Sequence, residues 1–121
     1  MLRGARSRGA RSAFAALAVG LQLAVLYAPR APSVDTGALP VDKAVHFIAF
    51  ALPTASLIWA GVPVRVAVGA MALHAPASEA VQHYLFPNRS GEVADLVADL
   101  VGVAVGGLVG RLADLKESSV G

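Results

Sequence analysis

Ionisable and amide side chains interrupt stretches of this sequence that are otherwise apolar enough to span a membrane. The set comprises Asp42, Lys43, His46, Glu79, Gln82, His83, Asp95 and Asp99. A charged side chain at the centre of a bilayer costs about 2.5 to 3.5 kcal/mol even on the most lenient insertion scale. We therefore expect a chain that keeps several of them to use them for pairing, ligand binding or proton transfer.

Helical spacing predicts that these polar side chains share three inward faces. Residues three or four positions apart lie on the same side of a helix. The sets with this spacing are Asp42, His46 and Phe50; Glu79, Gln82 and His83; and Asp95, Asp99, Gly102, Gly106 and Gly110. The glycines of the last set resemble the small-xxx-small pattern that lets two helix backbones approach closely. We therefore expect Gly102, Gly106 and Gly110 to pack against a neighbouring helix.

The residue types at this predicted site define the chemistry it could perform. Lys43 and Arg89 would bind anionic groups, and Gln82 would orient a ligand through its amide. The carboxylates would pair with cations or accept protons. The candidate ligand-binding residues are Asp42, Lys43, His46, Glu79, Gln82, Arg89, Asp95 and Asp99. No metal and no cofactor is expected, and no catalytic residue is assigned.

Composition places the chain in a membrane. Of its 121 residues, 56% are hydrophobic and only 15% are charged, and the mean hydropathy is +0.65. Such a chain is too apolar for a soluble domain of this length. The absence of cysteine excludes a disulfide framework, a thiolate metal site and a cysteine nucleophile. The formal charge of +2 does not indicate a nucleic-acid partner, because the basic residues are distributed as a topology signal.

Four apolar segments are close to the length needed to cross the roughly 30 Å of hydrocarbon in a bilayer. They run from about Ser12 to Ala28, Lys43 to Ala60, Val64 to Phe86 and Val93 to Leu112. A tight turn at Gly61, Val62 and Pro63 makes the second and third helices antiparallel neighbours. The predicted fold is an all-α, integral membrane four-helix bundle.

The distribution of lysine and arginine predicts the orientation of this bundle. With the N-terminus inside, the inner side holds seven basic residues, Arg3, Arg6, Arg8, Arg11, Arg65, Arg111 and Lys116, and the outer side holds Arg30, Lys43 and Arg89. Both termini are therefore expected in the cytoplasm. The predicted organisation is a basic segment at 1–11, a transmembrane domain at 12–112 and a tail at 113–121. A cleaved signal peptide is the alternative for the first segment, although its apolar stretch exceeds the roughly 7 to 15 residues of such a core.

This topology places all three polar faces at one depth, in the outer leaflet, so we expect them to meet in one layer. Structural interpretations remain open beside functional ones. Asp42 could be only a helix N-cap, and Lys43 could simply extend to the membrane interface. His74, in the middle of the third span, is expected to bond the carbonyl of Ala72, whose amide donor Pro76 removes.

These motifs resemble those of the VanZ-like family of membrane proteins. The residues that carry the resemblance are Val41, Asp42, Lys43, Ala44, Val45, His46 and Phe47 with Phe50; Ser78, Glu79 and Gln82; Arg89; and Asp95 with Gly102 and Gly106. They cover roughly Pro40 to Gly110. At position 99, where the family typically has asparagine, this chain has Asp99. Position 99 therefore either keeps a hydrogen-bonding role or adds a titratable carboxylate.

The resemblance implies a small integral protein of the bacterial cell envelope, located in the cytoplasmic membrane. The member that gives the family its name is associated with resistance to the glycopeptide teicoplanin. Our first hypothesis is that the polar layer binds the head group of an envelope lipid or of a lipid-linked wall precursor at the outer leaflet. A link to glycopeptide tolerance would follow from such binding.

Two other classes of function remain open at this point. The chain could be an intramembrane hydrolase or transferase, with water activated on a metal held by His46, Glu79, His83 and Asp95, although it has no HExxH motif. It could instead be a structural assembly module whose polar layer only holds four helices together. A proton-coupled carrier would require a homo-oligomer, because four short spans leave little room for a pathway.

Overall fold

The protein, seen here as a computed structural model, folds into α-helices. The structure describes residues 2–27, 39–85 and 93–120. These ranges form four helices and no strand: α1 (Leu2–Tyr27), α2 (Leu39–Trp59), α3 (Val64–Leu85) and α4 (Val93–Val120). The prediction of an all-α fold is confirmed. α1 extends back through the basic segment at 1–11, where alanine and arginine are strong helix formers.

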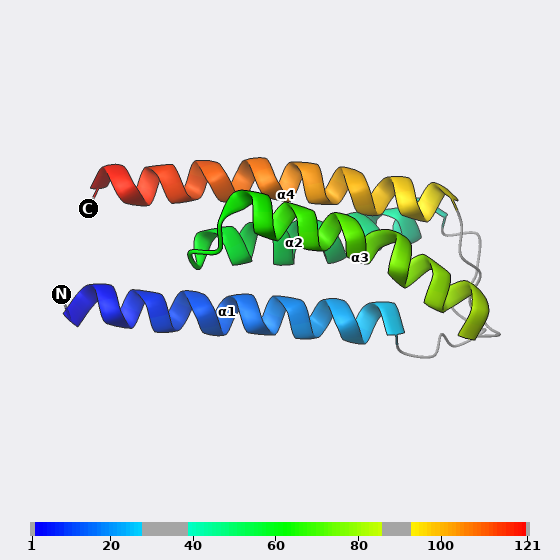
Figure 1. Cartoon of the computed structure of the whole chain (residues 1–121), viewed down its shortest axis with the longest axis horizontal. Coiled ribbons are helices and arrows are strands. Elements are labelled where there is room, and N and C mark those ends of the chain that lie inside the picture. Colours follow the sequence, from blue (N-terminus) through cyan, green and yellow to red (C-terminus); the bar gives the residue numbers. More distant parts are fainter. Residues whose placement is uncertain (1, 28–38, 86–92, 121) are drawn as a thin grey trace.

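The four helices lie side by side and alternate in direction (Figure 1). α1 and α3 run one way, and α2 and α4 run the other way. The start of α1, the end of α4 and the turn between α2 and α3 consequently lie at one end of the bundle. The ends joined by residues 28–38 and 86–92 lie at the opposite end.

The pair formed by α2 and α4 makes the most extensive contact between helices. Three glycines of α4 face α2, and a Cβ atom added at any of them would collide with α2. At Gly102 it would overlap the carbonyl of Phe47, and at Gly106 the backbone of Ala51. At Gly110 it would lie 2.9 Å from Cβ of Ile58. The glycines therefore allow two parallel helix backbones to touch, which is the packing that their spacing predicts.

The turn between α2 and α3 has a Schellman geometry. The Gly61 amide donates to the Ile58 carbonyl at 3.0 Å, and the Val62 amide donates to the Leu57 carbonyl at 2.9 Å. Gly61 adopts a φ of 110°, a left-handed conformation that side chains disfavour. Pro63 follows and prevents α2 from continuing. This short turn brings α3 back antiparallel to α2.

Proline lies inside both central helices, at Pro53 in α2 and Pro76 in α3. Each removes one backbone donor and favours a bend. Beyond its midpoint α3 turns away from α4 toward the end of α1 (Figure 1). Hydroxyl groups next to the prolines bond the local backbone: Thr54 Oγ1 donates to the Phe50 carbonyl at 2.6 Å, and Ser78 Oγ donates to the Ala75 carbonyl at 2.9 Å.

Two helices of the described part are long and apolar enough to cross a membrane, namely α1 over Arg8–Tyr27 and α4 over Val93–Lys116. The apolar part of α2, Lys43–Trp59, is shorter. α3 is less apolar than α2 and α4, because its second half carries several polar residues. Large apolar side chains on the outer faces of α1 and α4 are exposed, including Leu17 at 73% and Leu108 at 59%.

The glycine contact predicts a pair of matched substitutions. We expect Gly106→Ala to lower the free energy of unfolding in detergent by about 1 to 3 kcal/mol, because its Cβ would overpack against the α2 backbone. Gly69→Ala is the control, since no atom lies within 4 Å of the added Cβ. Thermal unfolding followed by circular dichroism measures both. Equal stability of the two variants would contradict the close α2 and α4 contact.

Candidate functional site

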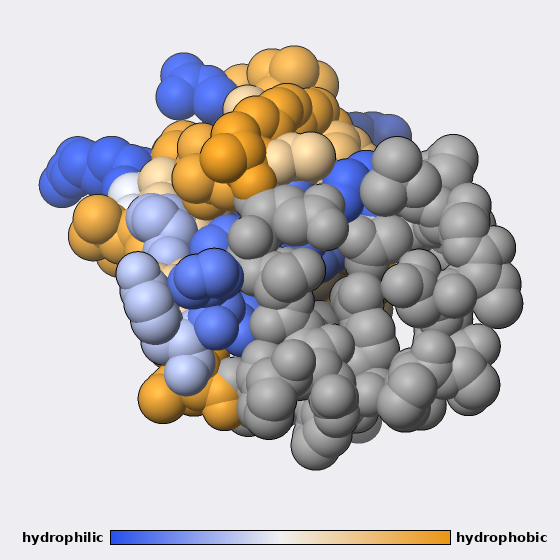
Figure 2. Space-filling model, turned by 90° about the vertical axis from the view of Figure 1, so that its right-hand side faces the viewer, coloured by the Kyte–Doolittle hydropathy of each residue, from blue (hydrophilic) through white to orange (hydrophobic). Residues whose placement is uncertain are grey.

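Five ionisable side chains meet where α2, α3 and α4 come together, near the end of the bundle opposite the termini. We call this group the polar cluster; it consists of Lys43, His46, Glu79, Asp95 and Asp99. All but Lys43 are buried, and Asp99 is completely inaccessible. Seen from that end of the bundle, both hydrophilic and hydrophobic residues reach the surface (Figure 2).

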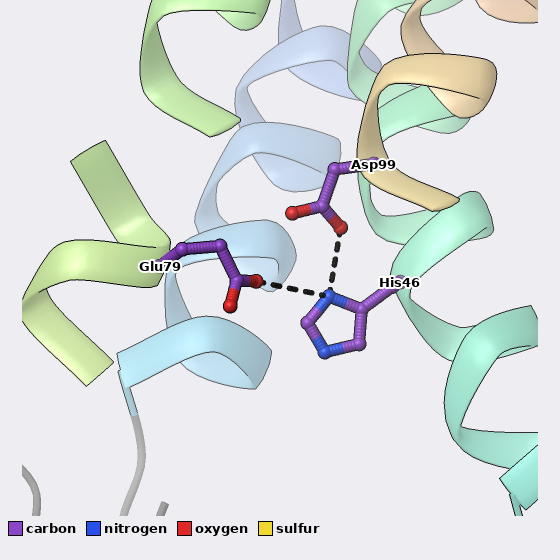
Figure 3. Close-up of side chains that lie close together, drawn as sticks. All are labelled: His46, Glu79 and Asp99. Carbon is purple, nitrogen blue, oxygen red and sulfur yellow. Dashed lines mark hydrogen bonds and ion pairs between the residues drawn. The ribbon is translucent and has the colours of Figure 1, made fainter. Parts of the chain in front are cut away.

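His46 is the centre of the polar cluster, because both nitrogens of its ring face carboxylates. Nδ1 lies 2.7 Å from Oδ1 of Asp99 and 3.8 Å from Oε1 of Glu79 (Figure 3). Nε2 lies 3.5 Å from Oδ2 of Asp95. The short contact with Asp99 is a hydrogen bond, whereas the other two are longer. The imidazole on α2 thereby links α3 to α4 and is held in one orientation.

Lys43 and Asp95 form an ion pair one helical turn nearer the end of the bundle. Nζ of Lys43 donates to Oδ1 of Asp95, and this bond again joins α2 to α4. The Lys43 side chain is 23% exposed, against 7% for that of Asp95. Lys43 is therefore the member of the polar cluster that can most readily contact a molecule outside the bundle.

The formal charges of the polar cluster do not cancel. Three carboxylates and one ammonium give a charge of −2 when His46 is neutral and −1 when it is protonated. Interactions between charges are stronger in a buried site than in water, and an uncompensated buried charge is costly. Among the described side chains of the site, carboxylates therefore outnumber cationic groups.

A second set of polar contacts joins α1 to α3 beside the polar cluster. Nε2 of Gln82 donates to the carbonyl of Leu26 at 2.7 Å. The hydroxyl of Tyr27 lies 2.8 Å from Nε2 of His74. The amide of Gln22 lies 3.3 Å from the sulfur of Met71. These contacts hold α3 against the first helix both before and after Pro76.

The structure brings five of the eight candidate residues together in the polar cluster. Gln82 lies beside them, and its amide donates to the carbonyl of Leu26 in α1, which clamps the two helices together. Arg89 and the side chain of Asp42 lie outside the described residues. His83 is exposed and stacks edge-on with Tyr84, with 4.7 Å between the ring centroids.

Sequence reasoning missed two polar residues of α1 and gave His74 a different partner. His74 bonds the Tyr27 hydroxyl, whereas we expected the carbonyl of Ala72. Gln22 is buried, with only 1% of its surface exposed. The signal for Gln22 was available, because a lone amide within an apolar span needs an internal partner.

Three donors of the polar cluster are close enough to share a metal ion. Nδ1 of His46 and one carboxylate oxygen each from Glu79 and Asp99 lie within 4.8 Å of one another. The set that we considered for an enzymatic metal included His83 and Asp95. In the structure, the third donor beside His46 and Glu79 is Asp99.

Comparisons with known proteins add no relative. No family model matches the chain, no curated protein matches it, and no solved structure matches it. Any function must therefore be argued from the residues and their geometry.

The hydrogen bond between His46 and Asp99 predicts how position 99 tolerates change. Asp99→Ala would leave the buried His46 nitrogen without its acceptor, so we expect a loss of about 1 to 3 kcal/mol of unfolding free energy. Asp99→Asn keeps an acceptor oxygen of the same size and is expected to lose much less. Thermal unfolding in detergent compares both with Asp114→Ala, near the opposite end of α4. An Asp99→Ala variant as stable as Asp114→Ala would refute this role.

Proposed function

We propose that the chain is a multi-pass protein of the bacterial cytoplasmic membrane, of the VanZ-like type, with four spans and both termini in the cytoplasm. The alternating directions of the helices support this topology, because α2 and α3 lie alongside the two helices that are long and apolar enough to span (Figure 1). The excess of lysine and arginine at the end that holds the termini supports the orientation.

Burial of polar groups supports a spanning role for α3 in spite of its composition. The polar residues of its second half point inward: Ser78 is inaccessible, Glu79 is 8% exposed and Gln82 is 2% exposed. Its outer surface includes Leu73, which is 75% exposed. Lipid contacts only the outer surface of a helix in a bundle. The average polarity of α3 therefore overestimates the free energy of placing this helix in a bilayer.

Single cysteines test this topology cleanly, because the chain has none of its own. We expect Ser90→Cys to react with a membrane-impermeant maleimide in cells whose outer surface is accessible, because residue 90 would face outward. Ser118→Cys should react only after the membrane is permeabilised. Labelling of Ser118→Cys in intact cells, or protection of Ser90→Cys, would overturn the proposed orientation.

We further propose that the polar cluster binds the head group of an envelope lipid or of a lipid-linked wall precursor. The observation that carries this proposal is an apolar groove between α1 and α2, about 140 Å³ in volume, whose α2 wall reaches Val45, at the level of the polar cluster along that helix. Its walls include Leu21, Val25, Val45, Ile48 and Leu52. Leu21 and Ile48 are more than half exposed, so the groove is open along the bundle.

The apolar groove suits the acyl chain of a lipid, and the polar cluster suits its head group. Val45, in the wall of the groove, lies only one residue from His46 along α2, so a chain in the groove would hold its head group at the depth of the polar cluster. Lys43 would bind the phosphate, because an ammonium can donate to a carboxylate and to a phosphate oxygen together. The carboxylates would attract an amine or accept hydrogen bonds from a sugar. If the lipid is a wall precursor, binding it would link the protein to teicoplanin tolerance.

Retention of lipid by the full chain in detergent tests the proposal. We expect Lys43→Met and Ile48→Trp each to lower the fraction of lipid-bound protein about tenfold, a loss of ~1.4 kcal/mol of binding. The first variant removes the phosphate contact, and the second fills the groove. The matched controls are Lys116→Met, near the other end, and Val105→Trp on the exposed face of α4.

Native mass spectrometry with added phosphatidylethanolamine or phosphatidylglycerol measures this fraction. A preference for the lipid that carries an amine supports the role of the carboxylates. Thermal unfolding establishes that each variant is folded, since Lys43→Met leaves Asp95 without its cation. Equal lipid binding by Ile48→Trp and Val105→Trp would refute the lipid site and favour a purely structural polar cluster.

A further inference from the structure

Three donor atoms from three different helices converge within the polar cluster (Figure 3). Nδ1 of His46 comes from α2, the carboxylate of Glu79 from α3 and that of Asp99 from α4. Donors bound to one Zn²⁺ at 2.0 to 2.2 Å stand about 3 to 3.6 Å apart. His46 Nδ1 lies 2.7 Å from Oδ1 of Asp99 and 3.8 Å from Oε1 of Glu79. Small side-chain rotations would therefore place all three on one ion.

Asp99 supplies an independent observation that points to a cation. Its side chain is completely buried, and Oδ1 is bonded to His46. Oδ2 is also buried and accepts no hydrogen bond from the described residues. Figure 3 shows this oxygen turned away from His46, toward the side on which Glu79 lies. A buried carboxylate oxygen without a donor is uncommon in proteins, and a bound cation is one of its standard explanations.

The formal charge of the described side chains in the polar cluster is compatible with a divalent cation. With neutral His46 the described side chains carry a formal charge of −2, which one divalent ion cancels. Neutralising a buried group of carboxylates removes their mutual repulsion and the penalty for an uncompensated charge.

The Nε2 side of the His46 ring faces a carboxylate, as the second nitrogen of a metal-bound histidine commonly does. A histidine that binds a metal through one nitrogen usually donates its other N–H to a carboxylate, which fixes the ring and the tautomer. Nε2 of His46 faces Oδ2 of Asp95 at 3.5 Å, and Lys43 in turn holds Asp95. Asp95 and Lys43 thus have the geometry of positioning residues for His46.

We propose that His46, Glu79 and Asp99 bind one divalent transition-metal ion, with Zn²⁺ as the best match. One imidazole and two carboxylates form a borderline donor set that suits Zn²⁺ or Mn²⁺. Ca²⁺ requires more oxygen ligands, and Mg²⁺ usually keeps several waters. Three protein ligands leave a coordination position for water or for an oxygen of a bound molecule. This site stands independently of the proposed lipid binding.

Metal binding to the full chain in lipid-free detergent tests this inference. After treatment with chelator, we expect the parent protein to bind one equivalent of Zn²⁺ and to give the visible spectrum of tetrahedral Co²⁺ when Co²⁺ is added. His46→Gln should abolish both signals. Asp99→Asn keeps the shape of the site but loses a charge, and it should weaken Zn²⁺ binding at least about tenfold.

Two control substitutions separate this site from adventitious binding. His83→Ala and Asp114→Asn remove a histidine and a carboxylate outside the polar cluster, and both should bind Zn²⁺ as the parent does. The inference is overturned if the parent binds no Zn²⁺, or if His83→Ala loses binding while His46→Gln keeps it. A second arm measures lipid retention with chelator present. If the protein binds zinc but no lipid, only the proposed lipid binding is refuted. If it binds lipid but no zinc, only the metal site is refuted.

Discussion

Close contact between the backbones of α2 and α4 determines the geometry of the whole polar cluster. Glycines on α4 allow the helices to touch along a parallel seam, where any Cβ atom would overlap α2. The seam fixes the register, so that His46 faces Asp99 and Lys43 faces Asp95. The two charged pairs are separated by 53 and 52 positions in the sequence, and the closest contacts of the three glycines with α2 by 52 to 55, as expected for two helices that run parallel. The close packing at the glycines and the pairing of the charged side chains thus both depend on the same contact between α2 and α4.

The remaining two helices complete this arrangement from the other side. α3 adds Glu79 to the polar cluster. It also contacts α1, because Gln82 donates to the carbonyl of Leu26 and His74 bonds the hydroxyl of Tyr27. In a bilayer these groups have no water to bond, so each contact inside the bundle replaces one that hydrocarbon cannot offer. The second half of α3 diverges from α4 (Figure 1), and its polar residues Ser78, Glu79 and Gln82 are buried inside the bundle.

The sequence predicted the helices, the turn and most of the inward faces, because these depend on local spacing; His83, which was predicted to face inward, is exposed. It could not predict that the parallel pair α2 and α4 would be the closest contact, since helices that are not joined by a turn pair through tertiary packing alone. The partner of His74 was missed for the same reason: Tyr27 lies 47 positions away, whereas the expected carbonyl of Ala72 is local. The role of Gln82 also depends on the bend of α3, which decides whether its amide reaches α1 or the polar cluster.

Position 99 connects the stability of the bundle to the chemistry proposed for it. As a hydrogen-bond acceptor for His46, an asparagine oxygen would serve as well as a carboxylate. An asparagine, which the resemblance to the VanZ-like family leads one to expect, would reduce the formal charge of the polar cluster from −2 to −1. It would also replace a strong ligand for transition metals with a weak one. Structure alone therefore does not require Asp99, and its extra charge is accounted for by a cation that it helps to bind.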